Sequence, residues 1–260
     1  MDRLLFATYS QSNIALYRDW ADHLQCGLEL HTFADPAVLC GDVEGLIAEH
    51  RRPLRGFRGP LGFHGAFYDM VSGSLDPAVV SVTRRRYRQN LAAASALNGQ
   101  YVIFHANYMG AFKLANYRSG WHRRQVKFWR ALVDEAADRQ LTILLENMWA
   151  DDPAIVADIL GEVDHPSFLA CLDVSHAVLF SHRPLLQWIE LLQPRLYCCH
   201  FNNTDGNVDL HWPLEEGIID PEPIIGSLRQ LPRPPYMTLE LPDWPTIARS
   251  LRYFDLQRYP

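Results

Sequence analysis

The segment HFNNTDGNVDLHWPLEEGIID, residues 200–220, is rich in side chains that bind metal ions. It places His200, Asp209 and His211 within twelve residues, around a glycine turn and directly after the apolar run LYCC. Asp209 and His211 alternate around Leu210, so an extended backbone would point both toward the same side. The spacing therefore predicts that this segment contributes to a metal or catalytic site.

Polar side chains of the same kinds interrupt other short apolar runs. Buried carboxylates and imidazoles cost several kcal/mol each unless they have partners. One such residue alone would be an ordinary hydrogen-bonded core residue, but six of them on six predicted strands would need a cation, which favours a divalent metal site. The motif DVSH adds His176, three residues beyond one of the six. The six are His64, His105, Glu146, Asp173, His200 and Glu240.

The apolar runs themselves predict the elements that position these residues. Most are separated by stretches of helical periodicity such as 129–139 and 153–163, the pattern of βα units around a parallel sheet. The first run is not followed by a GxGxxG motif, so an α/β fold of the (β/α)8 TIM barrel type is favoured over an open sheet, with the site at the C-terminal ends of its strands. The predicted strands are 4–10, 27–33, 59–67, 101–107, 141–147, 168–174, 195–201 and 236–241.

Length and composition set the remaining expectations. With 260 residues, 48% of them hydrophobic, the chain can form a single barrel domain over 1–260, and no linker or low-complexity segment interrupts it. The opening MDRLLFATYS lacks a signal-peptide pattern and no later stretch has the roughly 18 apolar residues of a membrane span, so we expect a cytoplasmic protein. Five cysteines without a CxxC spacing predict buried free thiols.

Basic residues are concentrated in one part of the chain. The net charge is −6, yet residues 51–130 hold 14 Lys and Arg against two acidic residues, a local balance of +12. Such a region can attract phosphates or nucleic acid, although 83–90 (TRRRYRQN) would also suit the solvated face of an outer helix.

The segment 106–125, which follows the fourth predicted strand, is long for a βα loop and is expected to cover the catalytic face. Its Lys113, Arg118 and Arg123 would then hold a phosphate or carboxylate of the substrate. The alternative is a loop packed by its own aromatic residues. Trp149 and Trp212 follow ligand-bearing strands and are expected to form walls of the pocket.

The chain resembles the xylose isomerase-like barrels, which include sugar isomerases and epimerases and the AP endonucleases of the endonuclease IV type. The resemblance spans nearly the whole chain and is carried by FHGAFYD, VIFHANY, LLEN, CLDVSHA, TLEL and the segment 200–220. It implies one to three divalent ions (Zn, Mn or Mg). The shared ion would be held by Glu146, Asp173, His200 and Glu240, and a three-metal site like that of the endonucleases would add His64, His105, His176, Asp209 and His211.

Two activities follow from this resemblance. An isomerase or epimerase of a small sugar or sugar phosphate would use Glu146 and Glu240 as general base and acid, with His176 and His64 on substrate hydroxyls. An AP endonuclease would use clustered metals to cleave a phosphodiester in DNA, with Glu146 bridging two ions. The segment 200–220 also resembles uncharacterised sugar-phosphate isomerases, apart from Glu215 in place of a glycine. The acidic and apolar loop TFADPAVLCGD favours the isomerase; the oligomeric state stays open.

Overall fold

The computed structural model describes residues 2–112, 114–254 and 256 of the chain. Eight parallel strands follow one another around a closed barrel, and the last pairs with the first. This confirms the predicted (β/α)8 TIM barrel. The strands are β1 (Arg3–Thr8), β2 (Gly27–Leu30), β3 (Leu61–His64), β4 (Tyr101–His105), β5 (Thr142–Glu146), β6 (Phe168–Asp173), β7 (Leu196–Phe201) and β8 (Tyr236–Leu239).

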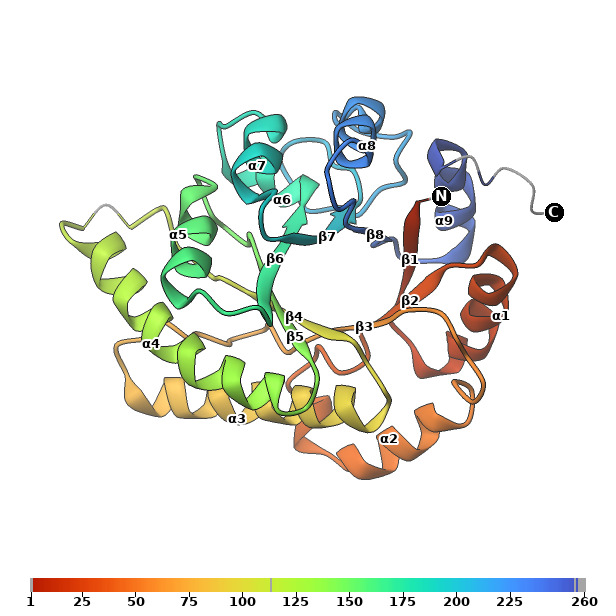
Figure 1. Ribbon diagram of the computed structural model, residues 1–260, viewed down its shortest axis with the longest axis horizontal. Helices are drawn as coiled ribbons and strands as arrows, with labels where there is room; N and C mark the ends of the chain where they lie inside the picture. The colour runs from red at the N-terminus through yellow and green to blue at the C-terminus, as the bar shows by residue number, and fades with distance from the viewer. Residues whose placement is uncertain (1, 113, 255, 257–260) are drawn as a thin grey trace.

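Helices surround this ring of strands, as Figure 1 shows. The α-helices are α1 (Ile14–Leu24), α2 (Val43–Arg51), α3 (Pro77–Ala96), α4 (Tyr117–Ala137), α5 (Ala154–Val163), α6 (Val174–Phe180), α7 (Leu185–Leu192), α8 (Pro221–Arg229) and α9 (Trp244–Ser250). Short 3-10 turns are η1 (Gln11–Asn13), η2 (Val38–Cys40) and η3 (Leu251–Phe254). No helix within the described residues is long and apolar enough to cross a membrane.

Aspartate caps start several of these helices. Asp76 accepts a hydrogen bond from the Ala78 amide at the start of α3, and Asp220 accepts one from the Glu222 amide at the start of α8. A proline at the first or second helical position follows each cap, where its missing N–H is not needed. These caps fix where the loops from the C-terminal ends of the strands turn back into helices.

The hydrophobic core has two parts. The larger lies between the strands and the helices and includes the fully buried Trp129 and Trp188. The smaller fills the barrel interior, where successive inward side chains of each strand stack in layers. It is formed by Leu5, Tyr101, Ile103, Leu144, Cys171, Cys198 and Tyr236.

Strand alternation places polar residues above this inner core. In β4 the inward side chains are Tyr101 and Ile103, so the next inward position is His105. The same two-residue step in the other strands brings one residue from each to the C-terminal rim. From β1 to β8 these are Tyr9, His31, His64, His105, Glu146, Asp173, His200 and Glu240.

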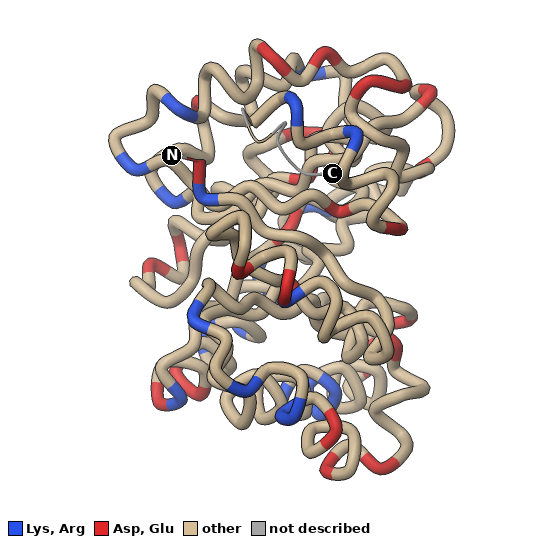
Figure 2. The backbone as a smooth tube through the Cα atoms, turned by 90° about the vertical axis from the view of Figure 1, so that its right-hand side faces the viewer, with Lys and Arg blue, Asp and Glu red and all other residues tan. Residues whose placement is uncertain are grey.

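The structure corrects the expected extent of one loop and the expected burial of one cysteine, and it confirms the expected position of the basic stretch. The segment 106–125 is a loop only as far as Asn116, because α4 begins at Tyr117. Cys40 is exposed, and the other four free cysteines are buried as predicted. The basic stretch 83–90 lies on the outer helix α3 as predicted. Figure 2 shows several Lys and Arg in the lower part of the molecule, where Figure 1 places α3 and α4.

Candidate active site

Asp173, His200 and Glu240 form one group of candidate ligand atoms at the rim. One ligand atom from each lies within 4.8 Å of the others, and all three residues are buried. His200 Nδ1 is 2.9 Å from Glu240 Oε2. The Asp173 carboxylate is oriented by hydrogen bonds from the His176 amide at 2.7 Å and the Asn202 side chain at 2.9 Å. These contacts leave the group few other orientations.

Glu146 joins a second group with His64 and His105. The Nε2 atoms of the two histidines lie 3.2 Å apart, and each is 3.5 Å from Glu146 Oε2. His64 donates its Nδ1 proton to the Gly65 carbonyl oxygen at 2.9 Å. That bond leaves the Nε2 lone pair directed at the group, the usual arrangement of a metal-binding imidazole.

The third group contains His176, Asp209 and His211. His176 Nε2 is 3.2 Å from Asp209 Oδ2, and His211 Nε2 is 3.3 Å from Asp209 Oδ1. His211 donates its Nδ1 proton to the Glu240 carbonyl oxygen at 2.8 Å, so its Nε2 faces the aspartate. His176 Nδ1 also lies 3.0 Å from Glu146 Oε1, which links this group to the second. The structure thus brings all nine predicted ligands together.

The charges of these groups shift one another's pKa values. Burial opposes ionisation of Glu240, but His200 and His211 outweigh it and lower the Glu240 pKa to about 2. Burial likewise disfavours the His211 cation, but Glu240 and Asp209 outweigh it and raise its pKa to about 10. The pKa of Asp173 rises to about 6, because burial and its carboxylate neighbours outweigh the nearby histidines.

Several buried ligand atoms lack a hydrogen bond. Unsatisfied buried polar atoms are rare in folded proteins, so a set that converges on one place calls for a further partner. Two or three carboxylates with several imidazoles are the donor set that zinc and related divalent ions take. The residues present therefore fit a divalent metal. The atoms are both carboxylate oxygens of Glu146, Nδ1 of His176, both ring nitrogens of His200 and Oε2 of Glu240.

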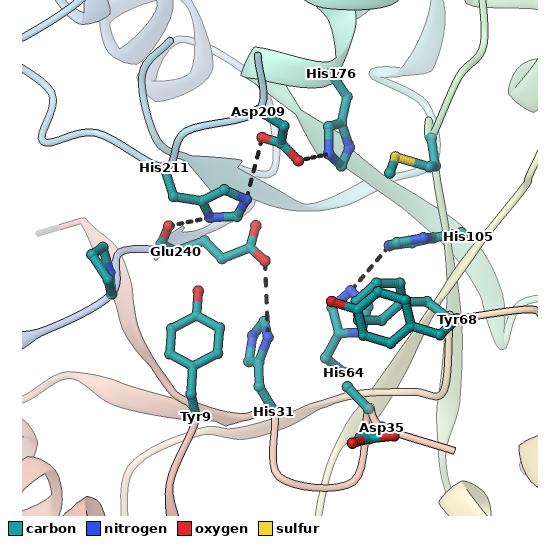
Figure 3. Close-up of a pocket in the computed structure, with 14 residues that line it drawn as sticks. Tyr9, His31, Asp35, His64, Tyr68, His105, His176, Asp209, His211 and Glu240 are labelled. Atoms are coloured by element: carbon teal, nitrogen blue, oxygen red, sulfur yellow. Dashed lines mark hydrogen bonds and ion pairs between the residues drawn. The ribbon is translucent and has the colours of Figure 1, made fainter. Parts of the chain in front are cut away.

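A cavity of about 660 Å³ opens above these groups (Figure 3). Its floor is formed by His64, His105, His176 and Glu240, and its walls are partly aromatic, with Tyr9, Phe67 and Tyr68. Asp35, on the loop that follows β2, adds a carboxylate to the cavity wall. The cavity has the size of a small-molecule pocket.

Sequence reasoning missed three residues of this site. Tyr9 and His31 line the cavity, and Glu29 is buried directly beneath His31 and His200. Glu29 and His31 interrupt the apolar run GLELHTF at alternate positions, which is the signal that identified the other six rim residues. The pattern was therefore sufficient to find these two.

Of the residues predicted to bind substrate, only some of those that the structure describes lie at the cavity. His64 lines the cavity. Arg118 lies instead in a groove between α4 and α5, 3.5 Å from Asp158. Trp149 is exposed and lines a neighbouring pocket, while Trp212 is half-buried beside the segment 202–204 and outside the cavity lining. These three do not reach the cavity, and Lys113 lies outside the described residues.

Comparison with known proteins agrees with this architecture. A structure of the TTHB071 protein from Thermus thermophilus, described as soaking with ZnCl2, is 27% identical, with a TM-score of 0.74 over 99% of this chain and 98% of that chain. D-allulose 3-epimerase from Methylomonas sp., in complex with D-allulose, is 18% identical, with a TM-score of 0.75 over 100% and 98%. A D-tagatose 3-epimerase-like protein is 17% identical, with a TM-score of 0.77 over 98% and 97%.

A comparison with curated protein sequences found no match. The family model described as xylose isomerase-like TIM barrel matches residues 43–256, a range that begins at α2 and includes every strand from β3 to β8. With the closed barrel and its rim of carboxylates and imidazoles, this match shows that the chain belongs to the xylose isomerase-like TIM barrel family.

Proposed function

We propose that this protein is a divalent-metal-dependent isomerase or epimerase of a small polyhydroxy ketone. The observation that carries the proposal is the placement of two carboxylates around one metal-binding imidazole. His200 Nδ1 lies 2.9 Å from Glu240 Oε2 and 3.7 Å from Glu146 Oε2. Glu240 directly follows β8 and Glu146 ends β5, so the two glutamates would approach a bound substrate from different sides of the barrel.

This arrangement suits proton transfer at a carbon next to a carbonyl. A divalent ion held by Glu146, Asp173, His200 and Glu240 would polarise the carbonyl and acidify the neighbouring C–H. One glutamate would take that proton as general base, and the other would return a proton to carbon or oxygen as general acid. His176 and His64 would orient substrate hydroxyls. The low pKa of Glu240 keeps it ionised, the form that a metal ligand or a general base requires.

The cavity supports a neutral sugar over a phosphorylated one. None of the described Lys or Arg residues lines it, whereas Asp35 does. A bound phosphate would meet that carboxylate without a guanidinium or ammonium group to offset it. Solved structures of similar fold include an epimerase bound to D-allulose, a ligand that a cavity of this size would accept.

A second candidate function is metal-dependent phosphodiester hydrolysis. It is favoured by the two further ligand groups, His64 with His105 and His176 with Asp209 and His211, because one ion does not need nine ligands. Glu146 lies close to both of these groups, next to His64 and His105 on one side and 3.0 Å from His176 Nδ1 on the other, as a carboxylate that bridges two ions would. The soaking of the TTHB071 structure with ZnCl2 is in keeping with zinc as the metal.

Metal content and substrate assays on one preparation separate the two candidates. The metal-loaded protein is tested on a panel of ketoses and ketose phosphates and on duplex DNA with an abasic site, with metal stoichiometry measured by elemental analysis. We expect ketose interconversion that disappears in Glu146→Gln and persists in the exposed control Glu190→Gln. Incision of the DNA without sugar interconversion, abolished by changing His64 or Asp209, would establish the hydrolase instead.

A further inference from the structure

Glu29 is a fully buried carboxylate inside the barrel, one layer below the rim. Its Oε2 accepts a hydrogen bond from the Tyr101 hydroxyl at 2.7 Å and one from the Thr238 hydroxyl at 3.1 Å. These two donors come from β4 and β8. One oxygen of Glu29 is therefore fixed from two sides, and the direction of the other oxygen is fixed with it.

The other oxygen faces two imidazoles. Glu29 Oε1 is hydrogen-bonded to His31 Nε2 at 2.9 Å and forms an ion-pair contact with His200 Nε2 at 3.0 Å, the latter outside ordinary hydrogen-bond angles. An ionised carboxylate can only accept hydrogen bonds. The hydrogen bond therefore places the proton of His31 on Nε2, and at His200 the negative oxygen 3.0 Å away favours a proton on the facing Nε2.

The opposite nitrogen of both rings then points toward Glu240. His200 Nδ1 lies 2.9 Å from Glu240 Oε2, and His31 Nδ1 lies 3.8 Å from Glu240 Oε1. His31 also forms part of the cavity wall, and its ring lies between those of Tyr9 and His64, tilted against both, at centroid distances of 4.7 and 4.8 Å (Figure 3). One carboxylate thus orients a metal-binding imidazole and a cavity-lining imidazole in the same way.

We propose that Glu29 is a positioning residue that holds His200 and His31 in the Nε2–H tautomer. His200 then offers its Nδ1 lone pair to the metal ion, and His31 offers its Nδ1 lone pair to a hydroxyl of the substrate. The first part of the proposal, the His200 half, concerns metal affinity alone. The His31 half rests on the proposed function, because it requires a polyhydroxy ligand in the cavity.

The surroundings of Glu29 argue against a purely structural role. The inner core around it consists mainly of apolar side chains and thiols, such as Leu5, Ile103 and Cys198. A buried carboxylate among them carries a desolvation cost that an apolar residue would avoid. Partners that fix the orientation of metal-binding imidazoles are a known use for such a group, and their loss lowers metal affinity about 10- to 100-fold.

The test compares Glu29→Met, which removes the acceptor, with Glu29→Gln, which keeps one acceptor oxygen without the charge. Tyr101→Phe is the matched control, because it removes a buried hydrogen bond of Glu29 and leaves both histidine contacts in place. Zn²⁺ affinity is measured by competition with a chelating dye, and histidine tautomers are read from ¹⁵N NMR of zinc-loaded protein. We expect Zn²⁺ affinity to fall about 10- to 100-fold in Glu29→Met, less in Glu29→Gln and under about 3-fold in Tyr101→Phe.

His31 is tested with D-allulose as the probe. His31→Phe keeps a ring in the wall, so zinc affinity should stay within about 2-fold of wild type while D-allulose binds at least about 10-fold more weakly, a loss typical of a ligand hydroxyl left unpaired.

The proposal is overturned if wild-type protein shows an Nδ1–H tautomer at His31 or His200, a result that needs no variant to fold. Unchanged zinc affinity in Glu29→Met would also overturn it. If wild-type protein binds zinc but no ketose, the proposed function fails and the His31 half with it, while the zinc titrations still decide the His200 half.

Discussion

The C-terminal end of each strand contributes one side chain to a layer at the rim of the cavity, and all eight side chains of this layer are titratable. Glu240 is kept ionised by His200 and His211, which lower its pKa to about 2 despite its burial. The same contacts favour the cationic form of those imidazoles, as the pKa of about 10 at His211 shows. A metal ion would therefore compete with protons for the same nitrogen atoms, because a ligating imidazole must be neutral.

Glu240→Gln should lower turnover without removing the metal site. The substitution keeps the shape and an oxygen ligand but removes the basicity that a general acid or base needs, so kcat should fall at least ~100-fold. The measurement is ketose turnover by protein whose metal content is determined in parallel. Near-normal turnover at full metal loading would exclude Glu240 from proton transfer, and Glu190→Gln, which alters an exposed glutamate on α7, serves as the control.

The pH dependence of stability should reveal the His211 ion pairs. A histidine with a raised folded-state pKa stabilises the protein fully below its unfolded pKa of roughly 6.5 and loses that effect as pH rises through the folded value. For His211 the folded value is about 10. The measurement is the urea midpoint of unfolding of wild type and of His211→Gln, with a chelator present. The wild-type midpoint should exceed that of the variant most near neutral or lower pH, and this difference should shrink toward pH 10. A constant difference would contradict this pairing.

Sequence reasoning found most of this layer because the strands alternate. His64, His105, Glu146, Asp173, His200 and Glu240 interrupt apolar runs, and that signal depends only on local pattern. Glu29 and His31 gave the same signal and were missed. Which nitrogen of His200 faces Glu29 and which faces Glu240 depends on side chains from other strands, and one sequence does not encode such contacts locally.

At the scale of elements, the segment between β7 and α8 shows how a loop without regular structure is held. Asn203 donates to the carbonyl oxygens of Leu214 and Ile219 and accepts from the amides of Thr204 and Ile219. Gly217 has φ of +104°, and a Cβ there would lie 2.5 Å from Asn203 Oδ1, so glycine is required. This network presents Asp209 and His211 to the site.

Replacing Asn203 by Ala should loosen this loop. Two backbone amides and two carbonyl groups would lose a buried partner, which should lower the free energy of unfolding by on the order of 3 kcal/mol. Because Asp209 and His211 sit on the same loop, bound metal per chain should also fall if more than one ion is present. Urea unfolding and elemental analysis measure the two effects, and the exposed Asn207→Ala on the same loop is the control.

The loop before α4 was harder to predict. Its helix starts after Asn116, which has φ of +63° and gives no side-chain cap, so the usual start signal is absent. The aromatic residues Tyr108, Tyr117 and Trp121 pack on one another, with centroid distances of 5.5 Å and 4.9 Å. This packing agrees with the alternative of a loop held by its own aromatic residues. Because α4 begins at Tyr117, Arg118 lies in the first turn of this helix and not in the loop.

At the scale of the whole molecule, the barrel was predictable because its eight strands and intervening helices repeat along the chain. Closure itself brings the eight rim residues together, since β8 pairs with β1. Charge separates by location: the basic residues of 83–90 lie on the outer helix α3, whereas Asp35 and the ligand carboxylates surround the cavity. The field near the cavity is therefore set by these carboxylates together with the histidines among them, and not by the basic residues of α3.

Metal removal should lower the stability of the whole barrel. The predicted ligands come from β3 to β8, α6 and the loop after β7, so an ion bound only by the folded chain would link most of the barrel. At a free metal concentration 100 times Kd, binding adds about 2.7 kcal/mol, which for a chain of this size corresponds to a thermal midpoint about 5–10 °C higher. Wild-type protein should lose this increment on chelation and regain it with Zn²⁺ or Mn²⁺. The double variant Asp173→Asn, Glu240→Gln should show little change, and an equal response in both proteins would place the stabilising ion elsewhere.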